Sequence, residues 1–353
     1  DTKRSEDVRA RIHALSEIPR QWRAAVARWR RLNRRHTADV DGRTAPDRND
    51  EYLLYQTLVG AWPLSPMGPE EQAVFLARIQ QYLLKATKEA KLNTSWINPN
   101  AAYDNALKQF VAGILERGAG NRFLPDFAAF QRPVARLGML NSLAQVLIKI
   151  TAPGVPDFYQ GAEMWDFSLV DPDNRRPVDF AVRASALASL RERIATGDLT
   201  GLARELVEHW PDGRIKLYTI HRALTCRRQS PFLFQDGDYV RLSIGGDRAG
   251  HVCAFARRRA TGTILTVVPR LTGRLTENGT VLPLGRDVWG DTHVLLPRDF
   301  PGQFYLNLFT GAEIQPGSTD AAFLPIGEIL AEFPVALLEA GPALSAFPGT
   351  ESS

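Results

Sequence analysis

The sequence TAPGVPDFYQGAEMWDFSLVDPDNRRPVD, residues 151–179, decides how the rest of the chain is interpreted. Residues 155–159 have the composition of a short buried strand bounded by a Pro-Gly and a Gln-Gly pair, with acidic and aromatic residues beyond its carboxyl end. Apolar spacing predicts a helix over residues 137–150 before it and another over 181–195 after it. This order is the repeat unit of an α/β barrel, so we interpret residues 155–159 as its eighth and last strand.

The whole sequence has the composition of an ordinary globular protein, with 353 residues, 44% hydrophobic and 23% charged. It contains no signal-peptide pattern and no apolar run of about 18 residues, so we expect a cytoplasmic protein without a membrane span. The two cysteines, Cys226 and Cys253, and six scattered histidines have no metal-ligand or disulfide spacing. We expect both thiols to be buried or inert.

The net charge of +4 raises the question of nucleic-acid binding. Much of the excess lies in QWRAAVARWRRLNRRH, residues 21–36, where Trp22, Val26 and Trp29 fall on one helical face and the arginines take the others. We interpret this as an amphipathic helix with a packed aromatic stripe and a solvated basic face. A nucleic-acid surface is the alternative, although no recognised binding motif accompanies the charge.

The segment Gly154-x-x-x-x-Tyr159-x-Gly161-x-Glu163 resembles the last-strand motif of the α-amylase family of glycoside hydrolases and transglycosylases. Within that family, residues 157–180 are most similar to the malto-oligosyltrehalose synthases. The resemblance implies the C-terminal part of a (β/α)8 TIM barrel, with a large helical insertion between strands 7 and 8 and an antiparallel β-sandwich domain after it. It also implies an isomerase that converts the reducing-end α-1,4 bond of malto-oligosaccharides to α,α-1,1, giving maltooligosyl trehalose in trehalose biosynthesis.

The first residues, DTKRSED, predict a helix start because acidic side chains in a first turn interact favourably with the positive end of the helix dipole. In the resembled family the seventh strand ends in a His-Asp pair that continues as Asp-Thr-Lys-Arg. The resemblance therefore implies that Asp1 is the third catalytic carboxylate, with helix capping as the alternative. It also implies that Lys3 and Arg4 bind sugar hydroxyls or keep carboxylates ionised, unless they are solvated cations. The nucleophile and the acid/base of the family lie on earlier strands, so we interpret this chain as part of a longer protein, inactive alone.

The residues between the two motifs read as helices over 49–61, 69–92 and 103–115. An insertion at this point of a barrel would stand over the active-site mouth and help to exclude water. The polar loop LNTSWINPN before the third helix carries Trp96, which we expect either to stack on substrate or to anchor packing.

Beyond the second motif, helices are predicted over 187–194, 202–210 and 216–228. From residue 232 the pattern changes to six short alternating runs, which indicate an antiparallel β-sheet domain of six to eight strands. The predicted domains are the end of strand 7 and the next helix, the helical insertion, the last barrel strand with its flanking helices, the β-sheet domain and a frayed tail, at residues 1–18, 19–132, 133–228, 229–345 and 346–353.

Other substrate-binding candidates follow the predicted last strand. Glu163 either binds sugar or braces an arginine, and Asp171 with Arg175 either pins the DPDNRRP turn or contributes to the subsite for the reducing-end glucose. The remaining candidates at this strand end are Tyr159, Gln160 and Trp165. We see no site for metal, nucleotide or haem, so no cofactor is expected. The expected partners are a malto-oligosaccharide and the N-terminal half of the same enzyme, without nucleic acid or membrane.

Two alternatives remain open at this stage. Another α-glucan hydrolase or transglycosylase of the same family would share the last-strand motif. A non-catalytic α-glucan-binding fragment would bind malto-oligosaccharide without turnover.

Overall fold

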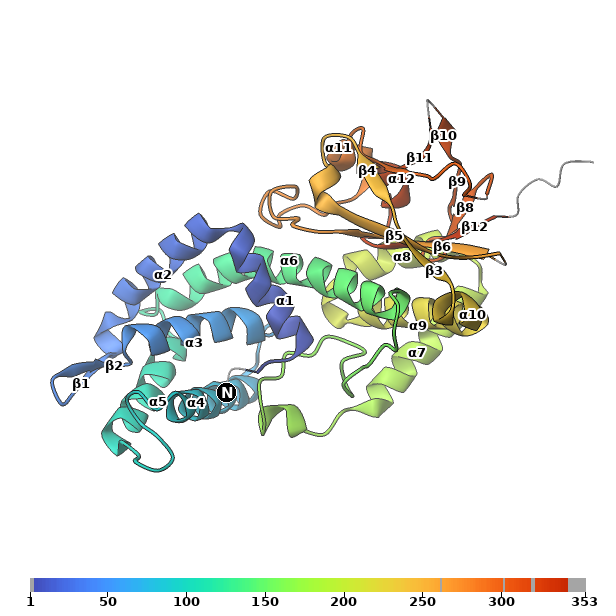
Figure 1. Ribbon diagram of the computed structural model, residues 1–353. Coiled ribbons are helices and arrows are strands. Elements are labelled where there is room, and N and C mark those ends of the chain that lie inside the picture. Colours follow the sequence, from blue (N-terminus) through green and yellow to red (C-terminus); the bar gives the residue numbers. More distant parts are fainter. Residues whose placement is uncertain (1–2, 261, 301, 319–320, 342–353) are drawn as a thin grey trace, which may run out of the picture. The chain divides into compact units, whose positions relative to one another are not determined.

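The computed structural model describes residues 3–260, 262–300, 302–318 and 321–341 (Figure 1). Asp1, the predicted catalytic carboxylate, and the predicted frayed tail at 346–353 lie outside the described residues. The chain forms two compact units. Unit 1 comprises the chain up to Ser142 with Trp165–Val178 and Glu277–Val281, and unit 2 comprises Leu143–Met164, Asp179–Thr276 and the chain from Leu282 onward.

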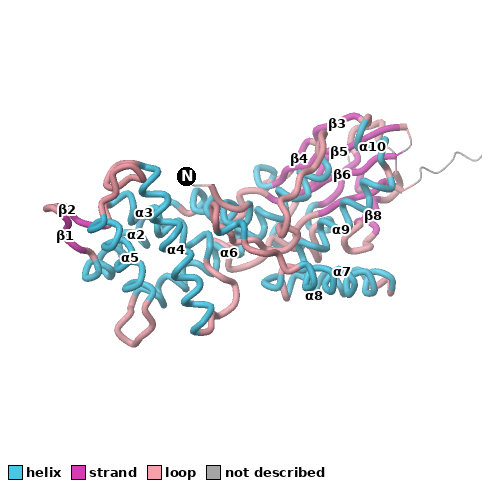
Figure 2. Tube along the Cα trace, turned by 90° about the horizontal axis from the view of Figure 1, so that it is seen from below, coloured by secondary structure: helices cyan, strands magenta, loops and turns pink. Residues whose placement is uncertain are grey.

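Unit 1 is built from helices and one small hairpin, which Figure 2 distinguishes by colour. The predictions of helices over 49–61, 69–92 and 103–115 are confirmed as α3, α4 and α5, and the helix at the chain start is also confirmed. The elements of this unit are α1 (Glu6–Ala14), α2 (Pro19–Asn33), β1 (Ala38–Val40), β2 (Arg43–Ala45), α3 (Arg48–Ala61), α4 (Pro69–Ala90), α5 (Ala101–Leu115) and the first part of α6 (Phe123–Thr151).

Local capping explains where these helices begin. The Ser5 side chain accepts a hydrogen bond from Val8 N–H at the start of α1, and the Asn100 side chain accepts one from Tyr103 N–H at the start of α5. At α3, Asp47 accepts from two first-turn amides. Both α2 and α4 have proline in the first turn, where its missing N–H costs no helix hydrogen bond.

The core of unit 1 centres on Trp29, which is fully buried. Its ring lies 5.3 to 5.7 Å from the rings of five aromatic residues: Trp22, Tyr55, Phe123, Phe127 and Phe130. Its Nε1 donates to Asp126 Oδ1 at 2.7 Å, so the indole is buried with its polar atom satisfied. The predicted packed face of α2 is therefore confirmed at Trp22 and Trp29, whereas Val26 is only half-buried.

The strand predicted over residues 155–159 is not formed in the described structure. Helix α6 continues to Thr151, and the chain then passes through bends and turns to Met164, with Val155 93% exposed. A parallel strand needs neighbouring strands for its hydrogen bonds, and the described residues provide none beside this segment. Residues 155–159 have the composition of a barrel strand, but no neighbouring strand among the described residues is available to pair with them.

Unit 2 begins with helices and ends with β-strands. The three predicted helices are confirmed as α7 (Phe180–Ala195), α8 (Leu199–Glu208) and α9 (Arg214–Gln229), followed by the short α10 (Pro231–Gln235). Cys226 is buried in α9, and burial raises the pKa of its thiol to about 12, which keeps it protonated and unreactive. Cys253 is a half-buried free thiol.

The β-strands of unit 2 form two antiparallel sheets. One has the order β3-β5-β6-β12-β8-β9 and the other β10-β11-β7-β4, and β5 pairs with β6 from Val252↔Pro269 to Arg259↔Gly262. Residues of both sheets, among them Leu265 and Val294, share one core with Trp289 of α11. The bounds are β3 (Asp238–Arg241), β4 (Ser243–Gly245), β5 (Val252–Arg259), β6 (Gly262–Pro269), α11 (Gly285–Trp289), β7 (His293–Leu295), β8 (Tyr305–Asn307), β9 (Glu313–Ile314), β10 (Gly317–Ser318), β11 (Ala322–Pro325), α12 (Ile326–Ile329) and β12 (Ala336–Ala340).

The six predicted strand runs correspond to β3 with β4, β5, β6, β7, β8 and β12. The structure adds β9, β10 and β11, which are too short or too irregular for a period-2 pattern to predict. Within the described residues, no helix is long and apolar enough to cross a membrane.

Candidate functional site

The first described residues of unit 1 pair with residues 166–169, which belong to the stretch that resembles the family. Ser5 N–H donates to Ser168 O at 3.0 Å, Ser5 Oγ donates to Asp166 O, and Arg4 forms an antiparallel bridge with Leu169. The arm, as we call residues 3–5, therefore lies beside residues 166–169, which follow it by more than 160 positions. Two segments that resemble active-site motifs are thus joined by backbone hydrogen bonds.

The side chain of Arg4 extends from the arm to helices α3 and α4. Its guanidinium carbon lies 5.5 Å from the centre of the Tyr82 ring, and its Nη2 donates to Thr57 Oγ1 at 3.3 Å. Burial lowers the pKa of Arg4, and burial also raises the pKa of Tyr82, against the effect of the arginine charge. The alternative that Arg4 is a solvated cation is therefore wrong, whereas Lys3 is exposed.

Asp7 and Arg11, which follow the arm in sequence, are buried side chains of opposite charge. Asp7 accepts hydrogen bonds from Asp166 N–H at 2.7 Å and from Ser142 Oγ. Arg11 stacks on the Phe167 ring, with its guanidinium carbon 3.6 Å from the ring centre, and donates to the carbonyls of residues 60 and 62. Burial lowers the pKa of Arg11 to about 9, although the charge of Asp7 acts in the opposite direction. Together these two side chains fix the position of residues 166–167.

The turn at residues 171–176 is held on helix α4 by two cations. Arg78 forms a two-pronged contact with Asp173, Nε to Oδ1 at 2.7 Å and Nη2 to Oδ2 at 2.9 Å. Lys85 Nζ donates to Asp171 Oδ1 at 2.9 Å. Arg175 Nη2 contacts Asp171 Oδ2 at 3.2 Å, so the aspartate–arginine pair that was expected to pin this turn is present. Arg175 itself is exposed.

The contacts of Asp173 lower the pKa of its carboxyl group. Burial by itself raises the pKa of Asp173, but the hydrogen bonds and charge of Arg78, together with the Leu169 N–H and the charge of Arg176, outweigh it and hold the pKa below its ordinary value of 3.8. A depressed folded-state pKa contributes stability that is fully present above the ordinary value and is lost as the pH falls through the folded-state value.

We expect Arg78→Ala to lower the free energy of unfolding by about 2 to 3 kcal/mol at about pH 7, because it removes the two-pronged partner of the half-buried Asp173 carboxylate and leaves it only the more exposed Arg176 and the Leu169 N–H. The difference from the unsubstituted protein should shrink at about pH 3, where Asp173 is protonated in more of the molecules. Urea unfolding at the two pH values measures both. Arg78→Lys keeps the charge but not the two-pronged geometry, and should lie between them. A pH-independent loss would contradict the assignment.

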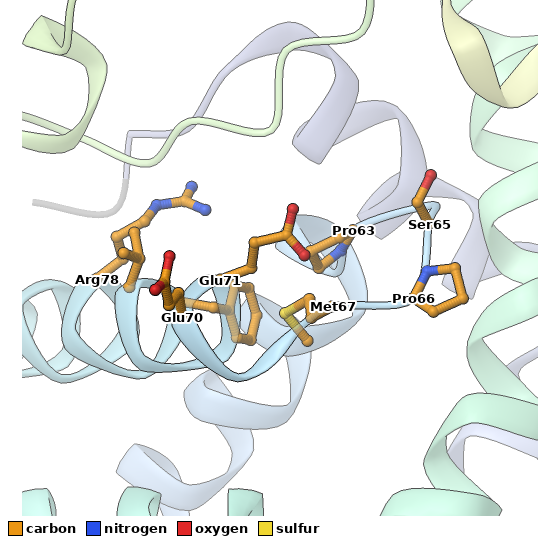
Figure 3. Close-up of a pocket in the computed structure, with 9 residues that line it drawn as sticks. Pro63, Ser65, Pro66, Met67, Glu70, Glu71 and Arg78 are labelled. Atoms are coloured by element: carbon orange, nitrogen blue, oxygen red, sulfur yellow. The ribbon is translucent and has the colours of Figure 1, made fainter.

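A groove of about 420 Å³ opens at the start of α4, next to Arg78. One wall is the first two turns of the helix, and the other is the loop at residues 63–67 (Figure 3). The side chains of Glu70, Glu71 and Arg78 rise from the same side of the helix in this view. Glu71 is already engaged, because its carboxylate accepts from Gly68 N–H at 2.7 Å and caps α4.

Trp96 lies in the loop between α4 and α5 and is 60% exposed. The Lys88 ammonium is 4.9 Å from its ring centre and 3.1 Å from Asp104, so one face of the indole is covered by a held cation. The alternative that Trp96 anchors packing is wrong, because most of the ring faces solvent. Leu92 and Ile97 of the same loop are also exposed.

The remaining candidates are divided between the two units. Tyr159, Gln160 and Glu163 belong to unit 2, and Trp165 with Asp171 and Arg175 belongs to unit 1. Tyr159 and Gln160 are exposed, and Trp165 is half-buried. Glu163 Oε2 accepts from Arg183 Nε at 3.1 Å, and Arg183 also donates to Gly161 O, so Glu163 braces an arginine.

Three residues of this region, Tyr82, Arg78 and Lys85, were missed from the sequence. Their spacing of four and three places them on one face of the predicted helix, which is the signal that was available. No group of three or more His, Cys, Asp or Glu residues able to hold a metal occurs among the described residues.

The sequence and the structure of this chain are similar to those of one kind of enzyme. No family model matches the sequence. A putative maltooligosyl trehalose synthase of Mycobacterium tuberculosis is 34% identical over 341 residues, which cover 96% of this chain and 36% of the relative. The solved maltooligosyltrehalose synthase of Arthrobacter ramosus matches 97% of this chain at 34% identity with a TM-score of 0.73, and a hypothetical synthase of Sulfolobus tokodaii matches 96% at 26% identity with a TM-score of 0.64.

This chain covers 37% of each of these two solved chains and spans about 36% of the curated relative. The resemblance stated from residues 157–180 is thus confirmed over nearly the whole chain. The length matched is consistent with a C-terminal portion of such an enzyme.

Proposed function

We propose that this chain, which is related over nearly its whole length to maltooligosyl trehalose synthases, is a working part of such an enzyme. The similarity along 96% of the chain carries the proposal. The reaction would convert the reducing-end α-1,4 bond of a malto-oligosaccharide to an α,α-1,1 bond. The pairing of the arm with residues 166–169 supports it, since this pairing joins the two segments whose sequences resemble the family's motifs.

Within this reaction, the nucleophile and the acid/base would come from earlier barrel strands of the longer enzyme. Retaining glycoside chemistry needs these two carboxyl groups about 5 to 5.5 Å apart. Asp1 would hold sugar hydroxyls beside the reacting carbon, and contacts of this kind strengthen as positive charge develops in the transition state. Arg4, fixed by Tyr82 and Thr57, would keep the neighbouring carboxylates ionised.

The released glucose must stay bound while its anomeric hydroxyl attacks the glycosyl-enzyme. Asp171 and Arg175 are our candidates for its subsite, because Lys85 and Arg78 fix the turn that carries them. Tyr159, Gln160 and Trp165 are further proposed substrate contacts, and Glu163 is proposed to act by holding Arg183. Water must be excluded during the reorientation, and we assign this role to the helices and loops of unit 1.

We also propose that residues 155–159 form a paired barrel strand only when the other strands of the enzyme are present, since parallel strands require neighbours. On this basis the helical insertion between strands 7 and 8 would be residues 19–132, and the β-sheet domain would follow from residue 229. The chain alone would then bind malto-oligosaccharides without turning them over.

The experiment that tests the proposal compares this chain with the same chain joined to its upstream parent sequence. Incubation with maltopentaose should remove reducing ends without releasing glucose in the longer protein, and calorimetry should detect binding without turnover in this chain. Glucose release matching the loss of intact substrate would instead indicate a hydrolase. If the longer protein neither bound nor converted maltopentaose, the proposal would be overturned.

We expect Trp96→Ala in the longer protein to raise the ratio of hydrolysis to isomerisation several-fold, because the exposed indole would help to close the site against water. Glucose and reducing-end assays on one sample measure the ratio. Leu92→Ala, at an exposed position of the same loop, is the matched control and should leave it unchanged. An unchanged ratio in both variants would exclude a closing role for Trp96.

A further inference from the structure

A groove of about 600 Å³ lies between helices α1, α2 and α3 of unit 1 and has no part in the function proposed above. Its volume falls within the range of small-molecule sites. It shares no lining residue with the arm, with the turn at residues 171–176 or with the loop of Trp96. Figures 1 and 2 both show α2 and α3 next to each other, and two side-chain hydrogen bonds join these helices.

The floor of the groove is apolar and rigid. It is formed by Ile12 of α1, by Leu15 just after that helix, and by Val26 and Trp22 of α2. The Trp22 ring is held by Trp29 at 5.7 Å and by Phe130 at 5.8 Å between ring centres. A floor fixed in this way loses little conformational entropy when a ligand settles on it.

Tyr52 supplies an aromatic face at the edge of this floor. It is 39% exposed, although its hydroxyl accepts a hydrogen bond from Trp22 Nε1 at 2.8 Å and its ring lies 5.7 Å from the Trp22 ring. The phenol is therefore held in one orientation while its ring stays accessible. An exposed aromatic ring that is fixed by buried neighbours is suited to stack on an apolar ligand face.

Polar groups line the two edges. Gln56 lies one turn beyond Tyr52 on α3, and Arg23 and Arg30 lie two turns apart on α2. The Arg30 charge is offset by Glu51, whose carboxylate is 2.8 Å from its Nε. The edges thus present planar amide and guanidinium donors around an apolar floor, and Arg23 is the one lining cation with no ion pair among the described residues.

We propose that this groove binds a segment of an α-glucan chain. A pyranose ring has two C–H faces and a rim of hydroxyls, which match an aromatic and aliphatic floor between hydrogen-bonding edges. A polyanion is the other ligand that the basic helix α2 suggests. Phosphate or sulfate groups call for several uncompensated cations, whereas this floor is apolar and Arg30 is already paired. The choice of α-glucan among neutral ligands rests on the proposed function.

The test is a titration of this chain with maltoheptaose, followed by the ¹⁵N–¹H signal of the Trp22 indole, assigned by Trp22→Phe. Binding at Tyr52 should shift this signal, because the indole N–H donates to the Tyr52 hydroxyl. Tyr52→Ala should weaken the binding about tenfold, since it removes the stacking face. Gln56→Ala leaves the ring in place and should weaken it about threefold, so the proposal stays testable if Tyr52→Ala unfolds.

Tyr239→Ala is the matched control, since Tyr239 is an exposed tyrosine of β3 with 51% of its surface accessible. It should leave the Trp22 shift unchanged. An immobile Trp22 signal at millimolar maltoheptaose would overturn the proposal, and a shift with dextran sulfate alone would assign the groove to polyanions. Isomerase activity of the longer protein with an immobile Trp22 signal would reject the groove alone. A Trp22 shift without such activity would reject the proposed function alone.

Discussion

Trp29→Ala is expected to lower the free energy of unfolding by about 3 to 5 kcal/mol, because it removes a fully buried indole from the centre of an aromatic cluster. Trp29 contacts five aromatic rings on helices α2, α3 and α6, so the cavity would lie where three elements meet. The substitution also removes the donor to Asp126 Oδ1, although that carboxylate keeps two bonds from Arg28. Urea unfolding followed by circular dichroism measures the loss.

Trp96→Ala is the matched control for this prediction. It deletes the same side chain from a position that is 60% exposed, and should change the free energy of unfolding by about 0.5 kcal/mol or less. Similar losses in the two variants would mean that Trp29 does not organise the core of unit 1.

Most helices of this fold could be predicted from the sequence because each carries its own signal. The stripe of Trp22 and Trp29 and the proline in the first turn predict α2 without knowledge of any other segment. The strands β5, β6 and β12 were predictable for the same reason, since each is a short run rich in apolar residues whose consecutive positions are mostly buried. Information of this kind is local.

The errors arise where the structure depends on distant residues. Residues 155–159 have the composition of a buried strand, yet a strand also needs hydrogen-bonding neighbours, and these come from elsewhere in a chain. The contacts of Arg78 with Asp173 and of Lys85 with Asp171 join positions about 90 apart, which no local pattern relates. Glu163 was correctly expected to brace an arginine as one alternative, but the sequence did not identify Arg183.

Asp7→Ala is expected to have an effect of similar size to Trp29→Ala, about 3 to 5 kcal/mol, because it leaves the buried Arg11 guanidinium without a counter-charge. It also removes the acceptor of Asp166 N–H and of Ser142 Oγ. The segment that pairs with the arm would therefore lose its anchor. Trypsin should then cleave faster after Arg175, which is exposed in the turn that follows.

A double substitution separates the two contributions of Asp7. Asp7→Ala with Arg11→Met removes the unpaired charge and keeps an apolar side chain over Phe167, so it should recover part of the lost stability. Cleavage after Arg175 should remain fast, since Asp166 N–H still has no acceptor. Glu332→Ala, which breaks an exposed pair with Arg204, is the control and should cost less than about 1 kcal/mol. A double variant no more stable than Asp7→Ala would show that the charge of Arg11 is not what Asp7 compensates.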